Sequence, residues 1–192
     1  ALFTDMGSEI TSEAMQIFGG YGYTKDQGIE QLYRDNRITP IYEGTNSVQA
    51  IDLVFRKLVN KNGDIIDRYI KMIKKDLENN NEKLSPFIKD LNIYLDKLIS
   101  FTTWIKDKVE NSKDDANAAC NDYLKVLGLI AVGHSWIKVL EVSFNDYDNN
   151  KEFYEDKIQT ARFFFQRVLP RIDTHCISAM SGSRYIMDFK FN

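Results

Sequence analysis

The chain is poor in the residues that mark disulfide-linked and metal-binding proteins. Its 192 residues include two cysteines and two histidines. Cys120 and Cys176 stand alone, without the Cys-x-x-Cys spacing of a metal or redox site, so we expect a reducing compartment and no metal cluster. His134 and His175 lie on apolar stripes of expected helices, which favours packed, hydrogen-bonded core residues over metal ligands.

An excess of positive charge and a long apolar run are also missing. The net charge is −3 at pH 7, which argues against nucleic acid as a partner. No run is long and apolar enough to predict a membrane span, and no signal-peptide pattern is present. We therefore expect a cytoplasmic protein without an integral membrane segment.

Strand patterning is absent as well. No segment alternates apolar and polar residues, and only three prolines interrupt the chain. Apolar residues instead recur at spacings of three and four, which predicts helices over residues 1–17, 29–36 and 46–61, with a glycine loop over 18–28. The first helix begins without a capping residue or an initiator Met, so we expect the chain to be a piece of a longer protein.

The remaining residues predict a second helical domain. Its helical stretches, separated by short polar links, are 64–77, 86–110, 116–137 and 154–179. Pro170 should kink the last of them. Asn60–Gly63 indicates a helix stop and the boundary between domains. We predict an all-α chain, with one helical domain over 1–62 and an antiparallel four-helix bundle over 63–192.

A carboxylate precedes the helix that is expected from residue 46. Glu43 lies in Tyr42-Glu43-Gly44-Thr45-Asn46, which follows Tyr33-Arg34-Asp35-Asn36-Arg37-Ile38. Backbone N–H groups and the positive helix end gather at such a junction, which can hold a base beside a bound ligand. From position alone, a carboxylate that only stabilises the helix N-terminus is the commoner interpretation. Thr45 or Asn46 can cap this helix.

A glycine-rich block lies upstream, in Gln16-Ile17-Phe18-Gly19-Gly20-Tyr21-Gly22-Tyr23. It does not fit the G-x-G-x-x-G spacing of a dinucleotide-binding turn, and no strand precedes it. N–H groups that are freed at a glycine loop can still cradle phosphates. Any helical protein can also use such glycines simply to end a helix.

Together, these segments resemble the C-terminal helical domain of the acyl-CoA dehydrogenases, over about residues 1–58. The continuation Ala50–Leu58 and the residues beyond it are similar, with less specific motifs, to a bacterial subgroup. Chains of that subgroup carry an extra helical domain after the dehydrogenase body. The resemblance therefore implies the end of the family's C-terminal helical domain, followed by the appended bundle.

The resemblance also implies a reaction. In the family, the Glu of Tyr-Glu-Gly-Thr removes the α-proton of an acyl-CoA thioester while a hydride passes from the β-carbon to FAD, giving a trans-2-enoyl-CoA. Glu43 would be this base, in a water-poor pocket that raises its basicity. Tyr42 and Gly44 would contact the substrate. An electron-transfer flavoprotein would be the partner that reoxidises the cofactor.

Two groups of residues would contact FAD by the same resemblance. One group belongs to the glycine-rich block and would face the FAD of a neighbouring subunit in a homo-oligomer: Gln16, Ile17, Phe18, Gly19 and Gly20. The other lies at the next helix start, where polar groups and a positive helix end suit an anionic cofactor: Thr45, Asn46 and Ser47.

Other interpretations remain open. We expect Arg34, Asp35 and Arg37 to form a buried arrangement that fixes the loop rather than to act in catalysis. The family's N-terminal helical domain and β-domain hold most of its flavin and acyl-CoA contacts, so we expect this piece alone to be inactive. The chain could also derive from an acyl-CoA oxidase, which shares the architecture, or be a non-catalytic helical interaction module with vestigial motifs.

Overall fold

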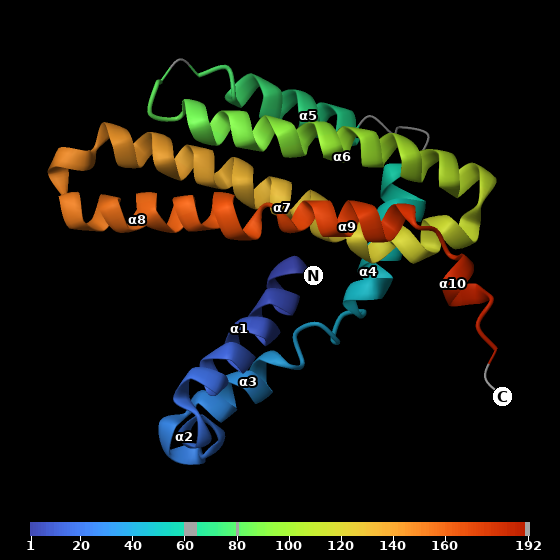
Figure 1. Cartoon of the computed structure of the whole chain (residues 1–192), viewed down its shortest axis with the longest axis horizontal. Helices are drawn as coiled ribbons and strands as arrows, with labels where there is room; N and C mark the ends of the chain where they lie inside the picture. Colours follow the sequence, from blue (N-terminus) through green and yellow to red (C-terminus); the bar gives the residue numbers. More distant parts are fainter. Residues whose placement is uncertain (60–64, 80, 191–192) are drawn as a thin grey trace. The chain divides into compact units, whose positions relative to one another are not determined.

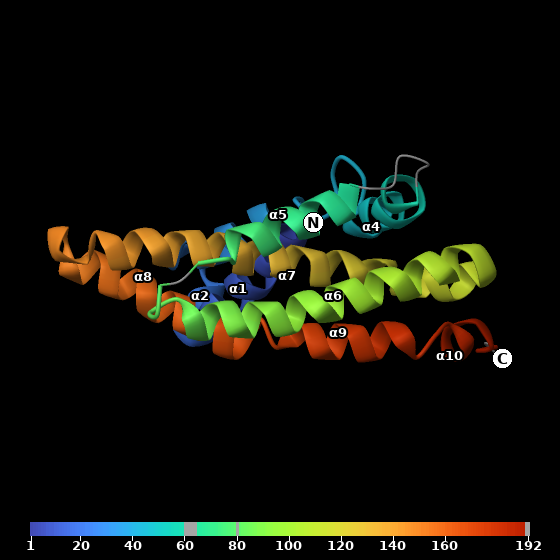
Figure 2. The same cartoon turned by 90° about the horizontal axis from the view of Figure 1, so that it is seen from above.

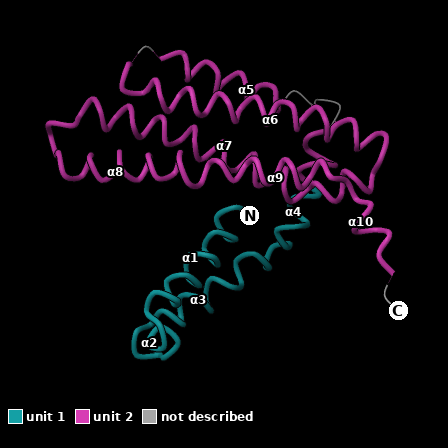
Figure 3. The backbone as a smooth tube through the Cα atoms, in the orientation of Figure 1, with its two compact units in different colours: residues 1–52 teal, residues 53–192 magenta. Residues whose placement is uncertain are grey.

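The computed structural model describes residues 1–59, 65–79 and 81–190, which form two compact units (Figure 3). The first unit is Ala1–Asp52 and the second is Leu53–Asn192. The described residues contain helices and turns and no strand, so the all-α prediction is confirmed. The predicted domain boundary after residue 62 falls outside the described residues and stays a prediction.

The first unit is built from short helices around one longer helix. They are α1 (Leu2–Phe18), α2 (Gly20–Tyr23), a 3₁₀ turn (Lys25–Gln27), α3 (Ile29–Asn36) and α4 (Asn46–Asp52). The helices predicted over 1–17 and 29–36 are confirmed. The prediction of an open loop over 18–28 is wrong, because α2 and the 3₁₀ turn occupy most of it. A helix of four residues is too short to show an apolar period.

Gly22 explains how α2 fits against the end of α1. It is the one buried residue of α2, and a Cβ there would lie 2.6 Å from the carbonyl oxygen of Met15. Only glycine allows this close approach of the two backbones. Gly19, with φ of 59°, ends α1 just before this contact.

The second unit begins with a π-helical turn (Leu53–Leu58) that continues from α4. Its main helices are α5 (Ile65–Asp76), α6 (Ser85–Asn111), α7 (Lys113–Asn145), α8 (Lys151–Phe163) and α9 (Arg171–Met180), with a 3₁₀ turn at Tyr147–Asn149 and a short α10 (Arg184–Met187) near its end. In Figures 1 and 2, α5, α6, α7 and α8–α9 run in alternating directions. The end of the helix predicted over 46–61 lies outside the described residues.

The helical stretch predicted over 154–179 is divided rather than merely kinked. A π-helical turn spans Phe164–Val168, where the N–H of Leu169 donates to the carbonyl of Phe164 at 2.9 Å. Pro170, which has no N–H to donate, follows at the start of α9. The break begins six residues before the proline, so the proline alone does not account for it.

The core of the second unit lies between α6, α7, α8 and α9. Its largest fully buried side chains include Leu91, Leu95, Leu98, Phe101, Ile105, Tyr123, Ile130, Leu140, Leu169 and Ile172. The five on α6 recur at spacings of three and four, the pattern of an amphipathic helix. Tyr123 is the polar member of the group, and its hydroxyl lies 2.9 Å from that of Thr102. Burial raises the pKa of Tyr123 to about 12, so this phenol stays neutral.

One expectation about membranes needs correction. Among the described residues, α7 is long and apolar enough to cross a membrane by length and composition alone. It packs against α6, α8 and α9, and 44% of its most apolar window is buried inside the chain. Such burial is what the central helix of a helical domain shows, and it makes the composition of α7 weak evidence for a membrane span.

Both histidines pair with carboxylates, as predicted for packed, hydrogen-bonded residues. His134 Nε2 is buried and lies 2.9 Å from Asp76 Oδ2, which also meets Lys138 Nζ at 3.0 Å. His175 Nδ1 lies 2.8 Å from Asp122 Oδ1. Hydrogen bonds from Lys138 and His134 hold the pKa of Asp76 below its ordinary value.

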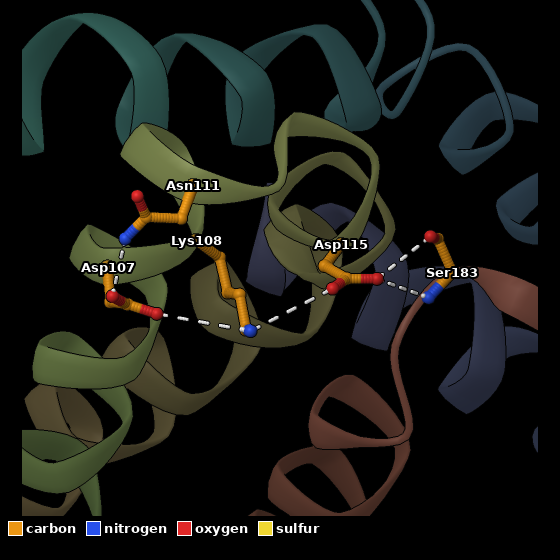
Figure 4. Close-up of polar contacts among 5 residues, drawn as sticks. All are labelled: Asp107, Lys108, Asn111, Asp115 and Ser183. Carbon is orange, nitrogen blue, oxygen red and sulfur yellow. Dashed lines mark hydrogen bonds and ion pairs between the residues drawn. The ribbon is translucent and has the colours of Figure 1, made fainter.

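A carboxylate at the start of α7 anchors the segment that leads into α10 (Figure 4). Asp115 Oδ1 accepts hydrogen bonds from the backbone N–H and the hydroxyl of Ser183, both at 2.8 Å. Lys108 Nζ lies 4.0 Å from Asp115 Oδ2 and 3.9 Å from Asp107 Oδ2, which joins the end of α6 to the same corner. The bonds from Ser183 lower the pKa of Asp115.

We predict that acid releases α10. A carboxylate with a lowered folded pKa stabilises the fold above its unfolded pKa, and this contribution is lost as pH falls from about 4 through the folded value. After correction for intrinsic exchange rates, the amides of Ile186, Met187 and Asp188 should lose hydrogen-exchange protection over this range. Asp115→Asn should lower that protection at pH 7 and remove its acid dependence, whereas Asp107→Asn should change neither. Unaltered protection in Asp115→Asn would contradict this account of the anchor.

Candidate functional site

The loop from residue 37 to residue 45 carries the predicted base and is closed by its own backbone. The N–H of Tyr42 donates to the carbonyl of Ile38, and the N–H of Asn46 donates to the carbonyl of Pro40, both at 3.1 Å. These bonds bring the start of α4 back toward the end of α3. The loop is therefore a compact turn rather than an extended linker.

Glu43 has an unusual backbone conformation. Its φ is 59°, which makes it the one non-glycine residue with a positive φ in the described part of the chain. The side-chain amide of Gln49 donates to the carbonyl of Glu43 at 3.0 Å and holds this conformation. Left-handed residues other than glycine cost free energy and gather at functional sites, which marks Glu43 as a candidate on structural grounds. Gly44 follows with φ of 89°, a value that favours glycine.

The start of α4 is fastened to the start of α1. The hydroxyl of Thr45 accepts a hydrogen bond from the N–H of Val48 at 3.4 Å, so the predicted helix cap is confirmed. The Asn46 side-chain amide donates to the hydroxyl of Thr4 at 2.8 Å and to Asp5 Oδ1 at 2.7 Å. Asn46 thus fixes where α4 begins relative to α1.

The end of α3 is fastened in the same way. The Asn36 side-chain amide donates to the hydroxyl of Ser8 at 2.8 Å. A Cβ on Gly7 would lie 2.4 Å from Asn36 Oδ1, so the missing side chain at this position makes room for the contact. Asn36 and Asn46 therefore bracket the loop that carries Glu43 and tie both of its ends to α1.

The expectation of a buried charged cluster in this loop is wrong. Arg34, Asp35 and Arg37 are all exposed. Arg34 Nε lies 3.6 Å from Glu30 Oε2, one turn away on the same helix, rather than pairing with Asp35. The side-chain amides of Asn36 and Asn46, rather than an Arg–Asp arrangement, fix the loop. Spacing along the sequence gives no signal for such contacts, because their partners lie on α1.

The glycines of the upstream block differ in their structural roles. Gly19 ends α1 and Gly22 packs against it, as described above. Gly20 has no positive φ, and no heavy atom lies within 4 Å of the place where its Cβ would be. The described residues thus give no reason for glycine at position 20. A small residue that faces open space leaves the backbone accessible to another molecule.

The structure does not bring the two predicted groups of cofactor contacts together. Asn46 contacts Asp5 near the start of α1, whereas Gln16 and the residues up to Gly20 lie at its end. Gln16 lies eleven positions after Asp5, which separates the two groups by about 16 Å along the helix, at 1.5 Å per residue. Within one chain, they cannot hold the same small part of a ligand.

The predicted site residues are open to solvent. Glu43, Gly44, Thr45 and Ser47 are exposed, Tyr42 is 53% exposed and Ile17 is 83% exposed. The described residues of the chain therefore do not form the water-poor pocket that was expected around Glu43. Whatever excludes water from this carboxylate during a reaction must come from outside these residues.

Two family models match the chain and together cover most of it. One, described as "Acyl-CoA dehydrogenase, C-terminal domain", matches residues 1–58. The other, "Acetyl-CoA dehydrogenase C-terminal like", matches residues 69–190 and so more than half of the chain. The chain belongs to the acyl-CoA dehydrogenase family. The resemblance drawn from the motifs is confirmed, including the appended domain.

Curated relatives align in two ways. The 3-methylmercaptopropionyl-CoA dehydrogenase of Ruegeria pomeroyi is 31% identical over 176 residues, and the butyryl-CoA dehydrogenase of Syntrophomonas wolfei is 27% identical over 187 residues. These alignments cover 86% and 90% of this chain, but 29% of each relative. The short-chain specific acyl-CoA dehydrogenase of Clostridium acetobutylicum is 51% identical over 47 residues, which are 24% of this chain and 12% of that protein.

We predict that Glu43→Gly stabilises the first unit. Glycine reaches the left-handed region without the penalty that other residues carry, although it also gains entropy when unfolded. The opening free energy of the α4 amides should therefore rise by up to ~1 kcal/mol in native-state hydrogen exchange.

The matched control places the same substitution in an ordinary helix. Glu13→Gly, on the exposed face of α1, should lower the opening free energy of the α1 amides by about 1 kcal/mol because glycine is a poor helix former. A loss of stability in Glu43→Gly as large as in the control would show that the Glu43 backbone is not strained.

Proposed function

We propose that this chain supplies the catalytic base and part of the cofactor site of an FAD-dependent acyl-CoA dehydrogenase. The reaction is the α,β-dehydrogenation of an acyl-CoA thioester to a trans-2-enoyl-CoA. The observation that carries the proposal is the left-handed, braced conformation of Glu43 within Tyr42-Glu43-Gly44-Thr45, in a chain of this family.

Glu43 acts as the base that takes the proton from the α-carbon. A carboxylate is a strong enough base for this step only where water is excluded, because desolvation raises its basicity. The exposure of Glu43 in this chain means that other parts of the protein, together with the bound thioester, must cover it. The brace from Gln49 sets the direction in which the carboxylate leaves the backbone.

The backbone of Glu43 also has a part in this proposal. Its N–H makes no hydrogen bond to any residue that the structure describes. It can donate to the thioester carbonyl, which stabilises the negative charge that develops there as the α-proton leaves. Tyr42 and Gly44 flank this position and are the proposed substrate contacts.

The residues present fit a cofactor that approaches the backbone. Gly20 leaves open space at the end of α1, and the hydroxyls of Thr45 and Ser47 lie at the exposed start of α4. The Asn46 amide is occupied by Thr4 and Asp5, so its contribution is to position the neighbouring hydroxyls. FAD, when bound, supplies the acceptor for the hydride that leaves the β-carbon.

We propose a homo-oligomer in which two copies share each cofactor. The separation of the two contact groups along α1 supports it, because one chain cannot present both to the same part of FAD. Exposed apolar side chains along α1, namely Phe3, Ile10 and Ile17, offer surface for such a contact. An electron-transfer flavoprotein is the proposed partner for reoxidation, and the proposed location is the cytoplasm.

The proposal predicts the result of Glu43→Gln in the complete gene product. The amide keeps the shape of the side chain but cannot accept the proton, so kcat should fall by at least about 10²-fold. Bound flavin, followed by its visible absorbance, should be retained. Glu13→Gln, an exposed substitution on α1, should leave turnover unchanged. Turnover near the wild-type rate in Glu43→Gln would exclude Glu43 as the base.

A further inference from the structure

Asp5, in the first turn of α1, is a carboxylate to which the sequence motifs assign no role. Its Oδ1 accepts a hydrogen bond from the Asn46 side-chain amide at 2.7 Å. In the part of the chain that the structure describes, no lysine or arginine pairs with Asp5. The charge of this carboxylate is therefore directed at one neutral amide, which belongs to the first residue of α4.

The Asn46 amide has three acceptors within reach, and Asp5 is the strongest of them. The hydroxyl of Thr4 lies 2.8 Å from the amide nitrogen, and the carbonyl of Ala1 lies 3.1 Å from it. An amide group carries two protons, so the three acceptors compete for them. A hydrogen bond to an ionised acceptor is roughly twice as strong as one to a neutral acceptor. Asp5 therefore contributes most to the position of Asn46.

Packing does little to fix α4 against α1. Helix α1 buries none of its residues, and α4 buries only Ala50. The side chains of Asp5 and Asn46 are half-buried, so water competes for their hydrogen bond less than it would at an exposed site. The position of the start of α4 thus depends on a polar contact rather than on an apolar core.

A displacement of Asn46 would move Glu43. The N–H of Asn46 closes the loop by donating to the carbonyl of Pro40, and Gln49 of the same helix holds the Glu43 carbonyl. Both contacts move with the start of α4. A displacement of about 1 Å in a reacting group can cost about 10²-fold in rate, so a small shift of this helix is enough to matter.

We propose that Asp5 is a positioning residue for the α-proton transfer, an inference that rests on the function proposed for Glu43. The Asp5 carboxylate holds Asn46, and Asn46 holds the loop from which the Glu43 side chain extends. Asp5 contacts neither the thioester nor the flavin. Its loss therefore lowers kcat and leaves the KM for the acyl-CoA nearly unchanged.

Exchange of the two partners tests this contact in the complete gene product, with each rate expressed per bound flavin. Asn46→Asp alone sets two carboxylates against each other and should lower kcat by at least about tenfold, with KM within about twofold of wild type. Asp5→Asn combined with Asn46→Asp reverses donor and acceptor and should restore kcat to within about threefold of wild type. Glu13→Asn, at an exposed position of α1, should change neither constant. If Asn46 acted instead by contacting flavin, the exchanged pair would remain as slow as Asn46→Asp, which would overturn the proposal.

A second measurement separates positioning from a general loss of structure. Asp5→Leu removes the acceptor and should slow deuterium exchange at the α-carbon, per bound flavin, by at least about tenfold. In a Glu43→Gln background, it should cause no further slowing, because Asp5 acts only through that carboxylate. Equal slowing in both backgrounds would refute the positioning role. If Asp5→Leu retains no flavin, the exchanged pair decides alone. Wild-type turnover in Glu43→Gln would refute the proposed function itself, whereas a failed exchange beside an inactive Glu43→Gln would refute only the role of Asp5.

Discussion

The candidate site depends on the side-chain amide of Asn46, which joins the start of α4 to the first turn of α1. Its bonds to Thr4 and Asp5 fix one end of the loop that carries Glu43, and the bond from Asn36 to Ser8 fixes the other. Gln49 then holds the Glu43 carbonyl itself. Each such bond contributes only about 1 kcal/mol, but together they fix the position of the Glu43 backbone, from which the carboxylate extends. Backbone hydrogen bonds from Tyr42 and Asn46 close the loop between these tethers.

This arrangement explains why the first unit presents chemical groups without enclosing a site. Its base, its helix start and its open glycine lie on exposed surface, and α1 keeps two of these regions about 16 Å apart. Few residues of the first unit are buried, so packing alone does little to orient its side chains. Specific polar tethers orient them instead. The second unit is different, because its long helices bury an apolar core and leave a cleft at one end.

Much of the fold could be predicted because long helices repeat their apolar residues at regular spacing. The bounds of α1, α3 and α6 follow from that spacing. The motif around Glu43 is the part of the sequence that identified the family. The four residues of α2 and the π-helical turn at Phe164–Val168 are too short to show a period. The tethers of Asn36 and Asn46 depend on partners on another helix, so local sequence patterns do not reveal them. Those patterns instead led to the wrong prediction that Arg34, Asp35 and Arg37 form a buried arrangement that fixes the loop. The positive φ of Glu43 is likewise a property of the backbone, and the identity of the residue does not predict it.

Proton exchange at the α-carbon tests the role of Glu43 most directly, since it isolates the one step that the carboxylate performs. The complete gene product is incubated anaerobically with an acyl-CoA thioester in D₂O, and deuterium at each carbon is followed by NMR. The account predicts that the wild-type protein introduces deuterium at the α-carbon and that Glu43→Gln slows this exchange by at least about 10²-fold. Exchange at the wild-type rate in Glu43→Gln would contradict it, because another group would then be removing the proton.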